Sequence, residues 1–208
     1  IAHLQHGIAL LTTLPDTPAR VQAELTLQTT LGPALIATRG LAAPEVAATY
    51  HRARALCEQA GDTVELFPVL WGLWLLYLGR AEHETAREFG EQCLSLARRL
   101  DDPALLLEAH LVLGSSGFYL GQLSQAHAHF EQGIRLYDPQ QHHALAFRYG
   151  NFDPGVGMRI YAGWTLWVLG YPEQALERSN QGLTMAQNLE HPYTLARGLY
   201  WTALLHQL

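Results

Sequence analysis

Large hydrophobic side chains recur along this chain at a helical spacing, and no segment shows the alternating β-branched residues of a strand. Along two predicted helices the aromatic residues are spaced by three positions: Trp71, Trp74 and Tyr77, then Tyr161, Trp164 and Trp167. The most apolar run, 66–78, lies between Glu65 and Arg80 and is well short of the roughly 20 residues needed to cross a bilayer. The pattern predicts an all-α chain without a membrane span.

Internal repeats divide the chain into units. The segment 132–136 (Gln-Gly-Ile-Arg-Leu) is echoed at 181–185 (Gln-Gly-Leu-Thr-Met). Pairs that open a helix, in which a capping residue precedes Pro or Thr, occur at Asp102-Pro103, His191-Pro192, Asp62-Thr63 and Thr17-Pro18. Glycines that close one helix and begin the next turn occur at Gly79, Gly121 and Gly170. These marks predict a repeat of about 40 residues, each made of two helices.

The repeat predicts helices that alternate between first and second members of antiparallel pairs. First helices are predicted near 18–38, 64–78, 103–120, 156–169 and 192–207, and second helices near 1–13, 44–60, 82–100, 124–137 and 172–189. We expect a single tetratricopeptide-like helix-hairpin solenoid over 1–208, a right-handed superhelix of antiparallel helix pairs. Ala126 and Ala175 follow turn glycines by five residues and are expected where paired helices approach most closely.

One irregular segment, at about 137–158, interrupts the repeat. It accounts for about nine residues beyond two periods of roughly 40. Two turn-forming Asp-Pro pairs bracket a centre that contains Phe147, Tyr149 and Phe152. Insertions in repeat proteins map to loops on one face, often the binding face. We therefore expect an ordered, partly buried element that leaves Arg148 or Tyr149 facing a groove.

Nine residues are candidates for contacting a partner, because aromatic residues and Arg dominate binding hot spots and the insertion is the expected site: Tyr137, Asp138, His142, Phe147, Arg148, Tyr149, Asp153, Trp74 and Trp164. Two alternatives stay open. The aromatic residues of the insertion could simply fill the gap in the stack, and the aromatic stripes could form core between first helices instead of lining a concave groove. Adjacent His142 and His143 have no carboxylate or Cys at a ligand spacing, so no metal site is expected there.

Charge and composition exclude several functions. The net charge is -6, from 19 acidic and 13 basic residues without a block of like charge, so nucleic acid is not an expected partner. All 13 basic residues are Arg. Without Lys the chain cannot form a phosphate-binding P-loop, a protein-kinase site or a Schiff base. We expect no cofactor and no catalytic residue in this segment.

Neither the cysteines nor the paired serines indicate chemistry. Cys57 and Cys93 lie in predicted helices without metal-ligand spacing and are interpreted as small buried hydrophobic residues in a reducing, cytoplasmic setting. The Ser115-Ser116 pair is flanked by glycines but lacks the preceding strand of a nucleophile elbow. We interpret it as a close contact between helices.

Several short segments carry a resemblance to a known family: 136–142 (Leu-Tyr-Asp-Pro-Gln-Gln-His), Ala146-Phe147, Tyr149-Gly150, Asp153-Pro154-Gly155-Val156, 14–18 (Leu-Pro-Asp-Thr-Pro), 66–72 (Leu-Phe-Pro-Val-Leu-Trp-Gly) and 169–172 (Leu-Gly-Tyr-Pro). They resemble the C-terminal tetratricopeptide region of large bacterial signalling ATPases. In those proteins an adenylate/guanylate cyclase-like or protein-kinase-like domain precedes an AAA/STAND-type nucleotide-binding domain. The resemblance covers nearly the whole chain and implies a sensor or scaffold arm. No position here matches the family's enzymatic motifs.

The expected function is therefore binding. The partner is expected to be a protein or peptide, or another domain of the same polypeptide. The alternative is a small-molecule or peptide sensor that uses the concave groove of the solenoid. The chain begins at Ile1 and ends within a predicted helix, so we expect it to be part of a longer protein. No pattern in the sequence specifies an oligomeric state.

Overall fold

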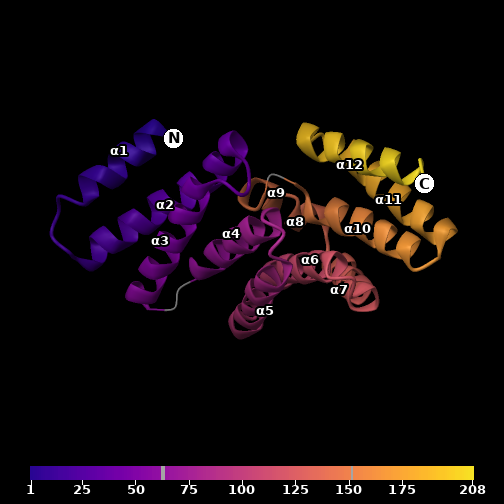
Figure 1. Cartoon of the computed structure of the whole chain (residues 1–208), viewed down its shortest axis with the longest axis horizontal. Helices are drawn as coiled ribbons and strands as arrows, with labels where there is room; N and C mark the ends of the chain where they lie inside the picture. The colour runs from indigo at the N-terminus through magenta and orange to yellow at the C-terminus, as the bar shows by residue number, and fades with distance from the viewer. Residues whose placement is uncertain (62–63, 151) are drawn as a thin grey trace. The chain divides into compact units, whose positions relative to one another are not determined.

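The computed structural model describes residues 1–61, 64–150 and 152–208, and in these residues every regular element is an α-helix (Figure 1). Consecutive helices pack in pairs, so the chain is an all-α helical solenoid, as the sequence predicts. It divides into two compact units, residues 1–93 and 94–208. The single right-handed superhelix over 1–208 stays a prediction.

The first unit is organised around Tyr50. It contains α1 (Ala2–Leu11), α2 (Pro18–Arg39), α3 (Pro44–Ala60), α4 (Leu66–Gly79) and the part of α5 (His83–Leu100) up to Cys93. The Tyr50 ring lies against Gly32 of α2 and Gly72 of α4, where an added Cβ atom would come within 2.5 Å and 2.0 Å of it. Because only glycine leaves room for the ring, these two positions allow three helices to pack around one side chain.

The second unit contains the remaining helices. They are α6 (Pro103–Tyr119), α7 (Leu123–Leu136), α8 (Pro139–His142), α9 (Leu145–Arg148), α10 (Pro154–Val168), α11 (Pro172–Asn188) and α12 (Pro192–Leu205). Helices α6 and α7 form one pair, α10 and α11 form another, and α12 packs against α11. Helix α10 also contacts α7, so the two pairs are adjacent within this unit.

The predicted helix boundaries lie within two residues of the observed ones, and the reasons are local. Asp102 and Asp153 precede a Pro and accept hydrogen bonds from amides in the first turns of α6 and α10. Gly121 and Gly170 have φ angles of 73° and 89°, in the left-handed region that glycine adopts at low cost. Short polar caps and turn glycines thus set where these helices start and stop.

One turn differs from the prediction, two short helices were not predicted, and one predicted cap lies outside the described residues. Gly79 is the last residue of α4 and does not form the turn; Ala81, with a φ angle of 59°, does. The irregular insertion contains two single-turn helices, α8 and α9, that the sequence pattern did not predict. The predicted cap at Asp62-Thr63 lies outside the described residues.

Small residues mark the closest approach of paired helices in the second unit. A Cβ atom on Gly117 of α6 would lie 3.3 Å from the Cβ atom of Ala126 of α7, and one on Gly114 would lie 2.4 Å from the Phe130 ring. In the next pair, a Cβ atom on Gly163 of α10 would lie 2.9 Å from the carbonyl oxygen of Ala175. Ala126 and Ala175 are fully buried. Their predicted place at the helix contact is confirmed. At the Gly-Ser-Ser-Gly segment the contact with α7 is made at the two glycines, while the buried Ser115 and Ser116 hydroxyls donate to carbonyl groups of their own helix.

The aromatic stripes contribute to the core. Trp71 and Trp74 are only 7% and 4% exposed, and their rings meet edge to face with centroids 5.2 Å apart. Trp164 is half-buried and lies 5.7 Å from Trp201 between ring centroids. The structure thus favours the core interpretation for Trp74, while Trp164 keeps part of its surface exposed.

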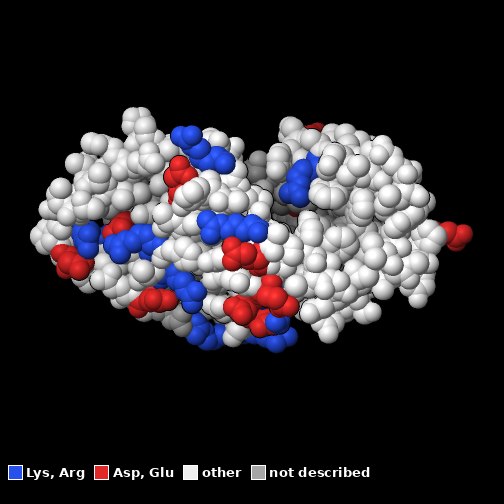
Figure 2. Space-filling model, in the orientation of Figure 1, with Lys and Arg blue, Asp and Glu red and all other residues white. Residues whose placement is uncertain are grey.

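Charged side chains are distributed unevenly over the molecule (Figure 2). In the first unit several form ion pairs, among them a bidentate pair in which Arg52 donates to Glu24 over 2.6 Å and 2.8 Å. The face that α11 and α12 present in Figure 2 is almost uncharged. Among the described residues, no helix is long and apolar enough to cross a membrane.

The close helix contacts lead to a prediction about volume. Ala126→Leu and Ala175→Leu each add three carbon atoms where no space remains, and each should lower the free energy of unfolding by ~1–3 kcal/mol. Ala128→Leu, at an exposed position of the same helix as Ala126, should leave it nearly unchanged. Urea unfolding followed by far-UV circular dichroism measures all three. Equal midpoints for the three variants would show that this helix register is incorrect.

Candidate functional site

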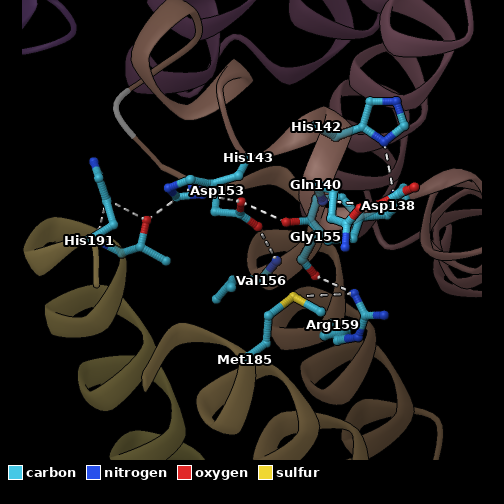
Figure 3. A network of polar contacts seen from close by, with 12 residues as sticks. Asp138, Gln140, His142, His143, Asp153, Gly155, Val156, Arg159, Met185 and His191 are labelled. Carbon is cyan, nitrogen blue, oxygen red and sulfur yellow. Dashed lines mark hydrogen bonds and ion pairs between the residues drawn. The ribbon is translucent and has the colours of Figure 1, made fainter. Parts of the chain in front are cut away.

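The insertion between α7 and α10 begins with a self-capped turn. One Asp138 carboxylate oxygen accepts a hydrogen bond from the amide of Gln140 over 2.8 Å, and the other accepts one from the side chain of Gln141 over 2.9 Å. The amide of Asp138 in turn donates to Nδ1 of His142 over 2.9 Å (Figure 3). His142 is buried, with 7% of its surface exposed. The first turn of the insertion is therefore held by its own side chains.

Asp153 connects the insertion to the surrounding helices. Its side chain is completely buried. One carboxylate oxygen caps α10 by accepting from the amide of Val156 over 3.0 Å. The other accepts from the Tyr137 hydroxyl over 2.8 Å and lies 3.0 Å from Nδ1 of His143 (Figure 3). The Asp153 amide donates to Thr194 Oγ1 of α12 over 3.1 Å. A single residue thus joins the end of α7, the insertion, α10 and α12.

Tyr137 acts as a permanent donor in this network. Burial, followed by the neighbouring Asp153 carboxylate, raises the pKa of the Tyr137 hydroxyl above its usual value. The hydroxyl therefore stays protonated at physiological pH and donates to Asp153. The guanidinium of Arg159 lies 5.8 Å from the Tyr137 ring centroid and donates to the carbonyl of Gly155 over 2.9 Å. Burial of the Arg159 guanidinium lowers the pKa of this group.

The hydrogen-bond network determines the tautomers of two histidines. Thr194 Oγ1 accepts a hydrogen bond from the Asp153 amide. The Thr194 hydroxyl therefore donates its own proton to Nδ1 of His191, 2.8 Å away. The Thr194 amide also donates to that nitrogen over 3.2 Å, so Nδ1 of His191 is an acceptor and Nε2 carries the proton. In His143, Nδ1 donates to the Asp153 carboxylate, which leaves Nε2 as an acceptor when the ring is neutral.

An exposed aromatic ring lies beside these two histidines. Phe147 is 69% exposed, and its ring centroid is 5.1 Å from that of His191 and 5.8 Å from that of His143. Arg148 is also exposed, with its guanidinium carbon 5.5 Å from the centroid of the Tyr149 ring. We call His143, Phe147 and Arg148 the insertion surface; the His191 ring that packs against Phe147 is itself buried, with 8% of its surface exposed. The surface presents an apolar ring, a cation and an acceptor from a buried polar scaffold.

The structure brings most of the sequence-predicted residues together, in different roles. Tyr137, His142 and Asp153 are buried supporting residues, Asp138 is a half-buried one, and Phe147 and Arg148 lie on the surface. Tyr149 is 2% exposed and belongs to the core, so of the two residues expected to face a groove only Arg148 is accessible. Trp74 is buried in the first unit, and Trp164 lies apart, beside Trp201.

Sequence reasoning missed three contributors to this site. His143 was considered only as a metal ligand, and His191 only as a helix cap. Thr194 was not considered. Their signal is weak because each depends on Asp153, which lies ten to 41 positions away along the chain. Among the described residues, no group of three or more His, Cys, Asp or Glu side chains could hold a metal ion.

A second feature of the unit is a polar pocket between α7 and α11. Its volume is about 230 Å³, and polar side chains of both helices line it around Leu166. Arg178 of α11 pairs with Glu131 of α7 over 2.8 Å, and Gln181 donates to Glu177 over 3.3 Å. Four of the lining side chains are therefore engaged with one another.

A third feature is a histidine pair between α6 and α7, in which His110 is buried and His129 is half-buried. Nδ1 of His110 and Nδ1 of His129 are 3.0 Å apart, a distance at which one donates to the other when both rings are neutral. Burial, and then the charges of His129, Arg98 and Arg135, lowers the pKa of His110 to about 4. Burial also lowers the pKa of His129. Both rings are therefore neutral near pH 7.

Comparisons with known proteins do not assign this chain to a family. No protein-family model matches the chain. An uncharacterized protein of Rhizobium meliloti (strain 1021) is 23% identical over 203 residues, an alignment that covers 94% of this chain and 19% of that protein. The chain therefore spans about a fifth of the length of this relative.

The Asp153 network leads to a prediction about stability. Asp153→Ala removes the cap of α10 and leaves the buried Tyr137 hydroxyl without its acceptor, so it should lower the free energy of unfolding by about 2–4 kcal/mol. It should also accelerate amide hydrogen exchange in 138–157. Asp138→Ala, which uncaps only the single-turn helix α8, should cost about 1 kcal/mol or less. Similar losses for the two variants would contradict the central role of Asp153.

The histidine pair leads to a prediction about pH. Because the folded-state pKa of His110 lies near 4 and the unfolded value near 6.5, the unfolded chain binds more protons between these values. Stability should therefore fall as the pH falls from about 6.5 to 4, with a contribution from His110 on the order of 3 kcal/mol. His110→Gln should reduce this pH dependence of urea unfolding. The exposed control His206→Gln should retain it, and identical pH profiles for the two variants would contradict the assignment.

Proposed function

We propose that this chain is a non-catalytic binding module that recognises a protein or peptide through the insertion surface. The observation that carries the proposal is the exposed Phe147 ring on a buried polar scaffold. A large aromatic side chain left in water costs free energy unless a partner covers it. Here the ring lies next to Arg148, and aromatic residues and Arg are the types that dominate binding hot spots.

The scaffold makes this surface suitable for recognition because it is already ordered. Asp153, Tyr137 and Thr194 hold the segments beneath Phe147, so a partner would not have to order them. Nε2 of neutral His143, a half-buried residue, is an acceptor. A peptide backbone offers an N–H donor in each residue other than Pro, which matches this acceptor.

The alternative, a small-molecule sensor, has weaker support. The pocket between α7 and α11 has a volume of about 230 Å³, below the roughly 300–1,000 Å³ of usual ligand pockets. It is lined by polar groups that pair with one another, such as Glu131 with Arg178, and among the described residues no Phe, Tyr or Trp lines it. We therefore favour a protein or peptide partner over a small molecule.

The wider role follows from the resemblance described above. We propose that the chain is a sensor or scaffold arm of a bacterial signalling ATPase, and that its partner is a separate protein or another domain of the same polypeptide. In the relative from Rhizobium meliloti the region that matches this chain is about a fifth of a longer protein, as the proposal expects of an arm. Nucleotide chemistry would then belong to other domains of the polypeptide.

Selection from a phage-displayed random peptide library, with the 208-residue chain immobilised, tests the binding function. Enriched peptides should bind the chain saturably in fluorescence anisotropy. The double variant Phe147→Ala with Arg148→Ala should weaken their binding at least about tenfold, equivalent to ~1.4 kcal/mol. Since both side chains are exposed, the thermal midpoint should change little.

Tyr171→Ala is the matched control, because Tyr171 is also an exposed aromatic residue of this unit, 51% accessible, but lies at the start of α11. It should leave peptide binding unchanged. A selection that enriches no peptide, or peptides whose affinity is equal for the double variant and the control, would contradict the proposal.

A further inference from the structure

The pairs in the second unit meet through a common stripe on their first helices. The C-cap of α6 is Leu120. Six residues before it, Gly114 contacts Phe130 of α7, and three residues before it, Gly117 contacts Ala126 of α7. In α10 the position six residues before the C-cap is Gly163, which meets Ala175 and Ser179 of α11.

A third position completes the stripe. Ten residues before the C-cap are His110 in α6 and Arg159 in α10, and their Cβ atoms lie near Gly133 of α7 and Gly182 of α11. An added Cβ on these glycines would be 3.4 Å from His110 and 3.2 Å from Arg159. The remaining position of α10, three residues before its C-cap, is Leu166, which is buried and packs in one cluster with Ala175 of α11. The same three positions of each first helix therefore contact the helix that follows it.

In α12 the equivalent stripe is uncovered. Counting back from its C-cap His206 gives Ala203, Tyr200 and Ala196, and all three are exposed. Tyr200 is 59% exposed, and Tyr193, one turn before Ala196, is 46% exposed. The other side of α12 packs on α11, where Thr202 hydrogen-bonds to Ser179 over 3.0 Å. We call Tyr193, Ala196, Tyr200 and Ala203 the α12 stripe.

The α12 stripe is continuous and uncharged. It contains two tyrosines and two alanines, and Figure 2 shows an almost uncharged surface over α12. Apolar stripes on helices are normally buried against another element. In α6 and α10 the element that covers the equivalent stripe is the second helix of the pair, so the α12 stripe has the form of a surface for a second helix.

The second helices of this unit share a docking pattern. Buried residues at i, i+4 and i+7 are Ala126, Phe130 and Gly133 in α7, and Ala175, Ser179 and Gly182 in α11. The large residue Phe130 is accommodated because it faces Gly114. In α12 the position equivalent to Gly114 is occupied by Tyr200. A helix that docks on α12 therefore needs small residues at i, i+4 and i+7, as α11 has.

We propose that the α12 stripe is the docking face for an amphipathic α-helix of the α11 type, with small residues at i, i+4 and i+7. This helix completes the pair that α12 begins. The inference is independent of the peptide-binding function, because the insertion surface and the α12 stripe share no residue.

A fusion tests the docking face directly. Residues 172–189 are repeated after Leu208, and Gln207→Gly supplies the turn, so that His206, position 207 and Leu208 correspond to Leu169, Gly170 and Tyr171. The fused chain should unfold at a temperature at least about 4 °C higher than the parent chain. Amide hydrogen exchange in α12 should slow at least about tenfold.

The matched control is the same fusion with Arg at the positions of the appended copy that correspond to Ala175 and Gly182. It should show the thermal midpoint and the α12 exchange rates of the parent chain. Equal behaviour of the fusion and its control would overturn the proposal.

Sedimentation of the parent chain adds a second test. If the parent chain forms a dimer that Tyr200→Glu dissociates, a second copy occupies the stripe and the α11-type assignment is overturned. A monomeric parent together with a stabilised fusion supports it.

Discussion

The buried carboxylate of Asp153 is the constraint on which the second unit depends. A carboxylate out of contact with water must have its oxygens satisfied, and here a helix amide, a tyrosine hydroxyl and an imidazole supply the hydrogen bonds. Those three groups come from separate segments, so the insertion can adopt few other conformations without leaving the charge unpaired. A loop that interrupts a helical repeat thereby becomes an ordered part of it.

Helix pairing follows a different constraint, which is volume. Glycine and alanine at the contact positions let the backbones approach, and a larger side chain is accepted only opposite a glycine, as Phe130 is opposite Gly114. The same rule organises the first unit, where Gly32 and Gly72 accommodate Tyr50. Each pair thus has a specific complementarity, and the exposed tyrosines of α12 are informative because they occupy a place that is otherwise filled by such a contact.

The two proposed interaction surfaces differ in chemistry. The insertion surface combines an aromatic ring with a cation and the imidazole of His143, and buried polar groups, His191 among them, hold it in place. The α12 stripe is uncharged and regular, as a contact between repeat helices requires. One surface is suited to recognising a partner and the other to extending the helical stack. The polar pocket between α7 and α11 matches neither, because its charges pair internally.

By itself the sequence determined the helices, their caps, most of their turns and the small residues Ala126 and Ala175, because backbone propensity, capping and helical spacing act within a few residues. It also located the insertion and most residues of the candidate site. Only the tertiary structure decided which side chains are accessible: Phe147 is exposed and Tyr149, two positions later, is buried. It also revealed the His110 and His129 pair and the place of Asp153 at the centre of a network. These outcomes depend on contacts between residues ten to 41 positions apart, and such contacts exist only once the helices have packed.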